Sequence, residues 1–543
     1  MPCLLHCVRM NIHNLFVMAA LLAAAGASAQ PTFSSHVAPI IYKNCTVCHR
    51  EGGGAPYALV TYEDVSRRAR MIVEVTQSQR MPPWLAVRGE VEFHNERGLS
   101  ADEIETLRAW SEAGTPLGEA SAVPPAPVYP SEWFHGTPDI LLEMEEEMEV
   151  PADGPDIYRN FVVRIPDIPE GKYLCGIDYK PRAVQSAHHS LFSLDTSGDM
   201  RRASDAEPRP GFGGMEANLI SGRVGGWAVG AQPDFFPEGV SLKVAPGTDL
   251  MVNAHFHPVG KPEMERARIA LYLTDKPPTR HMYALEIPFG FGIPSNLRIP
   301  PGEANYVLKE SFVLPVDVML SGLAPHAHLI AKEIKAEATF PDGRYINLIH
   351  VPKWDFAWQE QYHYKEPIAL PAGTRIDCTF VYDNSADNPF NPHSPPEEIT
   401  WGPNTTDEMA CVTLRVVMDS PEQLAMLKKG YGDWVKEALT HADFDIIDDA
   451  VSAQEKDRLD LNGDGNVSWA ESMALLRRIR QIITGSHDEL GIVHFLIWHL
   501  VKTELLPYLI PRLSIVLLVI FGIAWWRRRR RRNRIRKQLE QGT

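Results

Sequence analysis

The sequence predicts a multidomain, mainly β protein in which two β-sandwiches are flanked by helical units. Its 543 residues exceed the roughly 100 to 200 residues of a typical domain, so we expect several folding units. The chain contains 38 Gly and 44 Pro, which is typical of turn-rich β domains. Hydrophobic residues make up 44% and charged residues 22% of the chain, values that exclude whole-chain disorder and a coiled coil.

The first 29 residues have the order of a secretory signal peptide. Arg9 precedes an apolar run over 15–25, and the small residues Ala27, Ser28 and Ala29 follow at the position of a cleavage site. We therefore expect residues 1–29 to be removed and the rest of the chain to be exported.

Residues 31–118 form the first expected domain and carry a C-x-x-C-H motif. Apolar residues recur at helical spacing, which predicts a small α-helical unit. Within it, Cys45 and Cys48 can form thioethers to the vinyl groups of a haem, and His49 can ligate the iron. The motif therefore predicts a covalent haem c.

The same segment resembles the bacterial class I c-type cytochromes. The resemblance is carried by the motif, by a closing helix with Trp110, and by the strings Gly52-Gly53-Gly54-Ala55-Pro56 and Met81-Pro82-Pro83-Trp84. It implies a cytochrome c domain in which Met81 is the second axial ligand of the iron, a thioether that raises the haem potential. His94 is the competing ligand.

Residues 119–131 are rich in Pro, Ala and Ser and are expected to form a semi-rigid linker. Beyond them, short apolar runs alternate with turns such as Pro246-Gly247 as far as residue 420, which predicts β-structure. This region is too long for one ordinary sandwich. We therefore expect two, over residues 132–277 and 278–420.

Three histidine clusters and one methionine in this β region suggest metal binding. They are His188-His189, His255-Phe256-His257, His326-Ala327-His328 and Met409. In a strand, His326 and His328 point to the same face and can bind one ion, whereas His188 and His189 need a distortion such as a bulge to do so. Imidazole suits both copper and zinc, but a thioether beside two imidazoles favours copper. We therefore expect two copper ions.

The order of these clusters resembles the copper type II, ascorbate-dependent monooxygenases, the family of peptidylglycine α-hydroxylating monooxygenase and dopamine β-hydroxylase. The matching strings include Ala187-His188-His189, Pro325-His326-Ala327-His328, Tyr382-Asp383-Asn384 and Asp407-Glu408-Met409. The resemblance implies two jelly-roll-like sandwiches with one copper on each. The electron-transfer copper would be held by His188, His189 and His255, with His257 as a substitute for His255. The copper that binds dioxygen would be held by His326, His328 and Met409.

The chain departs from this family at two places. The peptide-amidating members have an Arg two residues before the His-x-His pair, where this chain has Ala324, so a peptide with a C-terminal glycine is a doubtful substrate. The family also has a disulfide Cys directly after the Met, whereas here Ala410 intervenes before Cys411 and would turn the thiol to the opposite strand face. A Cys378–Cys411 disulfide is therefore one of two alternatives that the sequence does not decide between, and Cys175 would be unpaired.

Residues 421–500 return to a helical pattern and contain an EF-hand calcium loop. Its six ligand positions hold oxygen-bearing residues, and Gly465 provides the turn at position 6. The expected calcium ligands are Asp460, Asn462, Asp464, Asn466, Ser468 and Glu471.

Residues 505–526 are long and apolar enough for one transmembrane helix. The basic tail, residues 527–543, contains eight Arg and is expected in the cytoplasm by the positive-inside rule. The formal net charge of the whole chain is −16 despite this tail, so nucleic acid is excluded as a partner of the folded body.

Together these features predict a copper monooxygenase anchored at the periplasmic face of a bacterial inner membrane. It would hydroxylate a C–H bond of a small molecule with O2 and receive electrons through its haem from a donor that the sequence does not identify. The linker is long enough for the haem unit to dock near the first copper. The alternative is a non-catalytic haem and copper protein that transfers electrons or binds copper.

Overall fold

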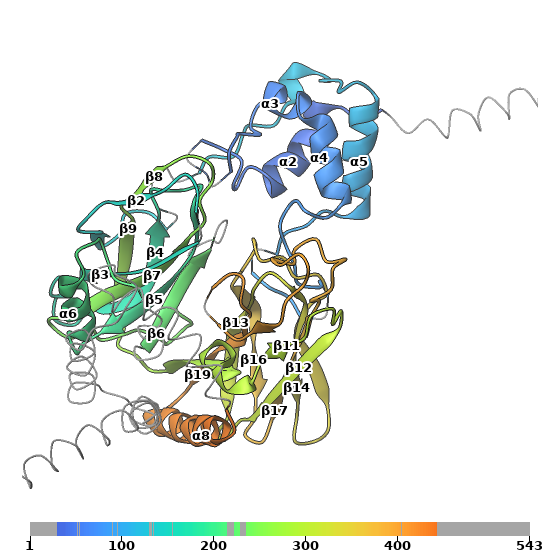
Figure 1. Cartoon of the computed structure of the whole chain (residues 1–543). Helices are drawn as coiled ribbons and strands as arrows, with labels where there is room; N and C mark the ends of the chain where they lie inside the picture. Colours follow the sequence, from blue (N-terminus) through green and yellow to red (C-terminus); the bar gives the residue numbers. More distant parts are fainter. Residues whose placement is uncertain are drawn as a thin grey trace, which may run out of the picture.

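A computed structural model describes residues 30–442, apart from 52, 54, 90, 95, 130–132, 134, 155, 214–221, 229–234 and 403. Figure 1 shows a helical unit next to two β units that lie side by side. Among the described residues, no helix combines the length and apolarity needed to cross a membrane. The expected signal peptide, EF-hand loop, transmembrane helix and basic tail lie outside the described residues.

The helical unit packs short helices around the buried side chains of Phe33, Ile41, Leu107 and Trp110. Its elements are η1 (Phe33–Val37), α2 (Ala38–Asn44), α3 (Tyr62–Ser66), α4 (Ala69–Gln77), α5 (Ala101–Glu112) and, in the linker, η2 (Ala120–Ala122). Capping boxes begin α3 and α5, because the side chains of Thr61 and Ser100 accept hydrogen bonds from the backbone N–H groups three residues on.

The first β unit consists of antiparallel sheets. A four-stranded sheet has the order β3-β7-β5-β6, a three-stranded sheet has the order β1-β9-β4, and β2 pairs with β8. The strands are β1 (Ile140–Glu143), β2 (Met148–Val150), β3 (Ile157–Arg164), β4 (Tyr173–Lys180), β5 (Ala187–Asp195), β6 (Gly222–Ala228), β7 (Asp249–Phe256), β8 (Glu263–Glu265) and β9 (Arg268–Thr274), with α6 (Asp199–Ala206) after β5. The largest buried cluster of this unit includes Phe161, Phe192 and Phe256.

The second β unit has two four-stranded antiparallel sheets, β10-β19-β13-β16 and β12-β17-β14-β15, and a short pair, β11-β18. Its elements are β10 (His281–Ile287), η3 (Phe289–Ser295), β11 (Arg298–Ile299), β12 (Tyr306–Val313), β13 (Val318–Ala327), β14 (Ala331–Thr339), β15 (Tyr345–Val351), β16 (Tyr362–Leu370), β17 (Arg375–Tyr382), β18 (Ile399–Thr400), β19 (Ala410–Met418) and α8 (Pro421–Thr440).

Alternating burial explains why these segments form sheets. Along β17 every second side chain, from Ile376 through Cys378 and Phe380 to Tyr382, is buried in the core. The expected mainly β architecture with antiparallel, jelly-roll-like sheets is therefore confirmed. The chain passes from the first β unit to the second between the end of β9 at Thr274 and the start of β10 at His281.

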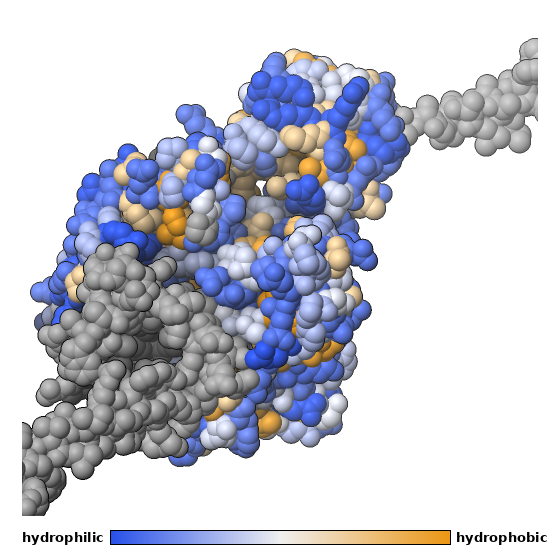
Figure 2. All heavy atoms as spheres, in the orientation of Figure 1, coloured by the Kyte–Doolittle hydropathy of each residue, from blue (hydrophilic) through white to orange (hydrophobic). Residues whose placement is uncertain are grey.

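Two sets of contacts join the units. Between the sandwiches, Arg223 of β6 forms an ion pair of 2.6 Å with Glu286 of β10, and both side chains are nearly buried. The segment 82–97 of the helical unit lies along β16, where Phe93 pairs with Tyr364 as an isolated β-bridge. The face of the molecule shown in Figure 2 is mainly hydrophilic, with apolar residues scattered over it.

Candidate metal centre

Three histidines of the first sandwich form a candidate metal site. His188 and His189 belong to β5 and His255 to the neighbouring strand β7, and each offers a ring nitrogen within 4.8 Å of the others. The pairing of β5 with β7 is irregular between Ala187 and His189. This is the distortion that two adjacent histidines need in order to face one ion. The Nδ1 atom of His189 lies 3.2 Å from that of His188 and 3.4 Å from that of His255.

Asp156 fixes which nitrogen His255 can offer to a metal. Its carboxylate lies 3.0 Å from Nε2 of His255, so Nδ1 is left for the ion. Tyr158 stacks on the His255 ring at a centroid distance of 4.3 Å. The alternative ligand His257 is 65% exposed and its Nδ1 lies 2.7 Å from the same carboxylate. The structure therefore places His255, and not His257, in the three-histidine group.

The second group lies on the other sandwich at the end of β13. The rings of His326 and His328 have a centroid distance of 5.3 Å. Nδ1 of His326 lies 2.6 Å from Oε1 of Gln359, and Nδ1 of His328 lies 3.1 Å from the carbonyl oxygen of Asp407. These contacts leave the Nε2 atoms of both histidines to bind a metal ion. Met409 is buried and lines the same cavity as both histidines.

Burial keeps these imidazoles neutral. It lowers the pKa of His188 to about 4 and that of His328 to about 4, and it holds the pKa values of His189 and His326 well below the usual range. Because a neutral imidazole is the form that binds a metal ion, both groups can take up metal at neutral pH.

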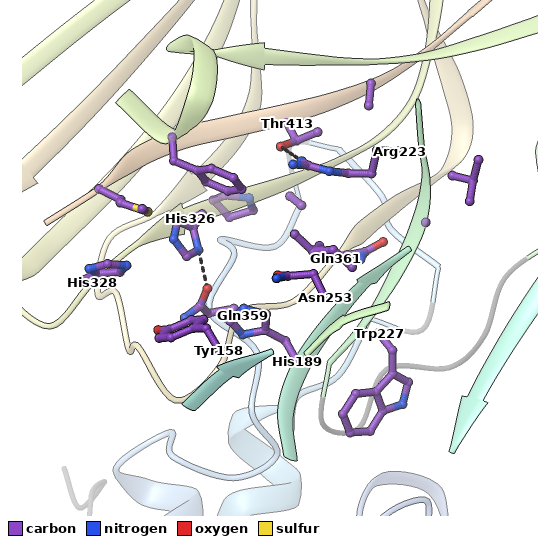
Figure 3. A pocket seen from close by; sticks show the side chains of 18 of the residues that line it. Tyr158, His189, Arg223, Trp227, Asn253, His326, His328, Gln359, Gln361 and Thr413 are labelled. Atoms are coloured by element: carbon purple, nitrogen blue, oxygen red, sulfur yellow. Dashed lines mark hydrogen bonds between the residues drawn. The ribbon is translucent and has the colours of Figure 1, made fainter. Parts of the chain in front are cut away.

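The two groups meet at one cavity of about 510 Å³ between the sandwiches. Figure 3 shows His189, His326 and His328 at its wall, with Gln359 directed at His326. Much of the lining is apolar and comes from Leu191, Val224, Trp227, Phe291, Leu323, Ala324 and Met409. Among the polar lining groups are the amides of Asn253, Gln359 and Gln361.

The guanidinium of Arg223 also lines this cavity, but it is already engaged. Besides its ion pair with Glu286, it donates a hydrogen bond of 3.3 Å to the hydroxyl of Thr413 and lies over the ring of Phe291. Thr413 is the cross-strand neighbour of Ala324. Ala324 therefore lies across from a residue that binds a cation already paired with Glu286.

The helical unit holds the C-x-x-C-H residues in a geometry that fits a covalent haem. The N–H groups of Cys48 and His49 both donate to the carbonyl oxygen of Cys45, so the motif forms one tight turn. Nδ1 of His49 lies 3.1 Å from the carbonyl oxygen of Tyr57, which leaves Nε2 for iron. A Cβ atom at Gly53 would lie 2.1 Å from the Cys48 carbonyl oxygen, so only glycine fits beside the motif.

The two alternative axial ligands lie in different surroundings. Met81 is half-buried, and its N–H donates to the carbonyl oxygen of Val75 at the end of α4. His94 is exposed, and its N–H donates to the carbonyl oxygen of His363 in the second sandwich. Its backbone is thus part of the contact with the sandwich.

Cys378, Cys411 and Cys175 are all free thiols. Cys378 faces the core between the sheets of the second sandwich. Cys411 lies on β19 two residues from Met409 and from Thr413, both of which line the cavity, so its side chain leaves the strand on their side. The Cys378–Cys411 disulfide does not form here: both thiols are free, and both are buried in the same core.

Sequence reasoning missed the residues that position the histidines. Asp156 and Gln359 belong to no motif, since their roles depend on contacts distant in the sequence. Glu408 belongs to the string Asp407-Glu408-Met409, but its role is visible only in three dimensions. Its buried carboxylate accepts hydrogen bonds from the N–H groups of His328, Ile330 and Met409.

Comparisons with known proteins assign no family to this chain. No protein-family model matches the chain, and no curated protein matches it. Among solved structures it is similar to PNGF-II, at 10% identity and a TM-score of 0.24, over 52% of this chain and 66% of that chain. It is also similar to the major capsid protein P2 of bacteriophage PM2, at 6% identity and a TM-score of 0.22, over 52% of this chain and 97% of that chain. Likenesses at these scores carry no conclusion about function.

Proposed function

We propose that this protein is a copper monooxygenase that hydroxylates a C–H bond of a small, mainly apolar molecule. The observation that carries the proposal is the meeting of two histidine groups, one from each sandwich, at a single cavity. The reaction consumes one C–H bond, O2, two electrons and two protons, and it yields C–OH and water. Bound copper would supply oxygen activation and one-electron storage.

Ligand chemistry supports copper over zinc. The first group consists of three imidazoles, and the second combines two imidazoles with the thioether of Met409. Thiolate or carboxylate ligands, which zinc sites commonly include, belong to neither group, and a thioether favours Cu(I). Asp156 would act on the first group only through His255, by holding its ring in place.

The cavity lining supports a neutral or weakly polar substrate. Apolar side chains would bury most of its surface, and the amides of Gln361 and Asn253 would orient a polar group. Ala324 offers no charge, and Arg223 is paired with Glu286. The other guanidinium groups that line the cavity also have partners: Arg159 donates to the carbonyl oxygens of Pro210 and Gly211, Arg209 pairs with Glu207, and Arg415 donates to the hydroxyl of Ser321. A carboxylate would therefore lose its hydration in this cavity while competing for cations that are already engaged.

The helical unit would supply electrons through a haem c held by Cys45, Cys48 and His49, with Met81 proposed as the second axial ligand. Calcium binding at 460–471, a membrane anchor at 505–526 and a periplasmic location remain parts of the proposal that rest on the sequence.

Metal analysis and oxygen consumption test the proposal. We expect about two coppers and one haem per chain in the fully loaded protein, because two ligand groups and one C-x-x-C-H motif are present. A screen of small molecules against the reduced protein should find one that raises O2 consumption and gains one oxygen atom. Zinc in place of copper, or less than one copper per chain, would contradict the assignment. Reversible haem and copper redox chemistry without any substrate-dependent O2 consumption would favour a non-catalytic electron-transfer protein.

A further inference from the structure

An ion pair between Arg97 and Glu360 joins the haem-binding unit to the second sandwich. The two side chains are only 11% and 14% exposed, so solvent screens the pair little. On the haem-binding side, Nε of Arg97 donates a hydrogen bond of 3.1 Å to the carbonyl oxygen of Pro83, and the guanidinium lies 5.7 Å from the ring centroid of Trp84. The pair is therefore held firmly on that side.

Arg97 also lies near the proposed second axial ligand of the haem. Pro83, whose carbonyl oxygen accepts the hydrogen bond from Arg97, is two residues after Met81 in the chain. The contact of Arg97 on the haem-binding side therefore leads to Met81 through the peptide bonds of Pro82 and Pro83.

On the other side of the ion pair, the residue next to Glu360 contacts a candidate copper ligand. Gln359 precedes Glu360, and its Oε1 lies 2.6 Å from Nδ1 of His326. Its Nε2 donates to the carbonyl oxygen of Phe356 in the same loop, which fixes the amide. One short loop thus contacts both the haem-binding unit and the second histidine group.

Neighbouring contacts keep the two units in this arrangement. Trp84 packs against Tyr362 at a ring centroid distance of 5.1 Å, and Phe93 stacks on Tyr364 at 5.0 Å. Backbone hydrogen bonds from Val87 to His350 and from Lys365 to Glu92 flank these rings. The connection through Arg97 and Glu360 is therefore embedded in an ordered interface.

We propose that Arg97, Glu360 and Gln359 form the route by which electrons pass from the haem to the second metal group, at His326. The inference rests on the proposed function. In each step ferrous haem would lose one electron and become ferric, and Cu(II) at the second group would gain it and become Cu(I). Two such transfers supply the electrons of one hydroxylation. The sequence alone had suggested docking near the first copper, which would make the three-histidine group the entry point.

The route consists of covalent bonds, hydrogen bonds and one ion pair. Electron tunnelling decays less steeply through bonded contacts than across empty space, so a continuous path of this kind favours rapid transfer. Arg97, Glu360 and Gln359 are positioning residues in this proposal, since none of them ligates iron or copper.

Anaerobic flash photoreduction of the haem in the holoprotein, loaded with Cu(II), tests the route. Haem absorbance reports its reoxidation, and the electron paramagnetic resonance signal of Cu(II) reports the acceptor. We expect the double variant Arg97→Gln, Glu360→Gln to reoxidise haem at least tenfold more slowly. It removes both charges together and so avoids leaving one buried charge unpaired.

The matched control is Glu92→Gln with Lys365→Gln. These residues form an exposed ion pair of 3.3 Å in the same interface, but their contact does not lead to His326. We expect less than a twofold change for the control. Haem content, copper content and haem reduction potential should stay at wild-type values in both double variants. Glu360→Asp, with Arg97 unchanged, keeps the carboxylate and should reoxidise haem faster than the Arg97, Glu360 double variant.

One further variant identifies the acceptor. His326→Ala should abolish haem reoxidation by Cu(II), and in the wild type the Cu(II) signal that disappears should be that of the second group. Haem reoxidation that persists in His326→Ala, or an unchanged rate in the Arg97, Glu360 double variant with full haem and copper, would overturn the route while leaving the proposed function intact. A chain that binds no haem or no copper would overturn the proposed function, and the route with it.

Discussion

His189 and His326 belong to different sandwiches, yet their ring centroids lie 6.3 Å apart. Phe356 lies beside both histidine groups, because its ring stacks on His188 at 5.4 Å and contacts His328 at 5.7 Å. Thr405 of the second sandwich donates a hydrogen bond to Asp156 of the first. In this arrangement one cavity lies beside both groups.

Replacing Met409 by Ile should abolish substrate-dependent O2 consumption, with a loss of at least about 100-fold. The change removes the only thioether of the second group but nearly conserves volume, so the cost in stability should stay below about 1.5 kcal/mol. At least about one copper per chain should remain, because the three-histidine group is intact. Metal analysis and oxygen-electrode measurements on one preparation check both points. Unchanged turnover would show that Met409 is only a core residue.

Replacing Asp156 by Asn should weaken copper binding at the three-histidine group about 10- to 100-fold, because this carboxylate orients the His255 ring. Competition with a copper chelator measures the affinity. The control is Thr405→Val, which removes the hydrogen bond to Asp156 across the sandwiches but keeps the contacts of Asp156 with His255 and His257. If the affinity of the Asn variant equals that of wild type, the orienting role is wrong.

Replacing Ala324 by Arg should introduce an unpaired cation into the cavity. We expect the affinity for a neutral substrate to fall at least about tenfold, because a buried charge must be desolvated. The affinity for carboxylate-bearing analogues should rise. The control Ala324→Met adds comparable bulk without charge and should not favour carboxylates. Binding titrations with paired neutral and acidic ligands distinguish the two variants, and equal preferences in both would contradict the proposal of a neutral substrate.

Replacing Glu265 by Gln should change how stability depends on pH. Burial raises the pKa of Glu265 to about 7, although the N–H groups of Ala183 and Arg182 donate to its Oε2. A raised carboxyl pKa gives stability that is present below about pH 4.5 and is lost as pH rises through about 7. The wild type should lose up to about 3 kcal/mol over this range, at 1.36 kcal/mol per pKa unit. The Glu265→Gln variant should not show this loss of stability.

Thermal unfolding at pH 5 and pH 8 measures this difference. Glu263→Gln is the matched control because Glu263 adds no pH dependence between pH 5 and pH 8. Burial alone would raise the pKa of Glu263, but Lys261 and Ser186 bind its carboxylate and lower the pKa. Its stability contribution is therefore present above about pH 4.5 and lost in acid. A constant difference between wild type and Glu265→Gln across pH would show that Glu265 is ionised throughout.

The sequence predicted the candidate metal ligands better than the groups that orient them. His188, His189 and His255 were recognisable as pairs and clusters, and the strand bulge that adjacent histidines require is present at His188. Asp156 could not be recognised, because it is about 100 residues from His255 in the chain and lies in no pattern. Whether His255 or His257 belongs to the group also depended on which ring β7 buries.

Local order alone determined the mainly β class, the helical unit with its C-x-x-C-H motif and the identity of the histidine clusters. Burial alternation, turn residues and ligand spacing are properties of neighbouring residues, and these can be read along the chain. Only the tertiary structure decided that His189 and His326 face one cavity, that Glu286 neutralises Arg223, and that Arg97 meets Glu360. Such relationships arise when separate sheets pack face to face, and the partners that this packing selects leave no periodic signal in the sequence.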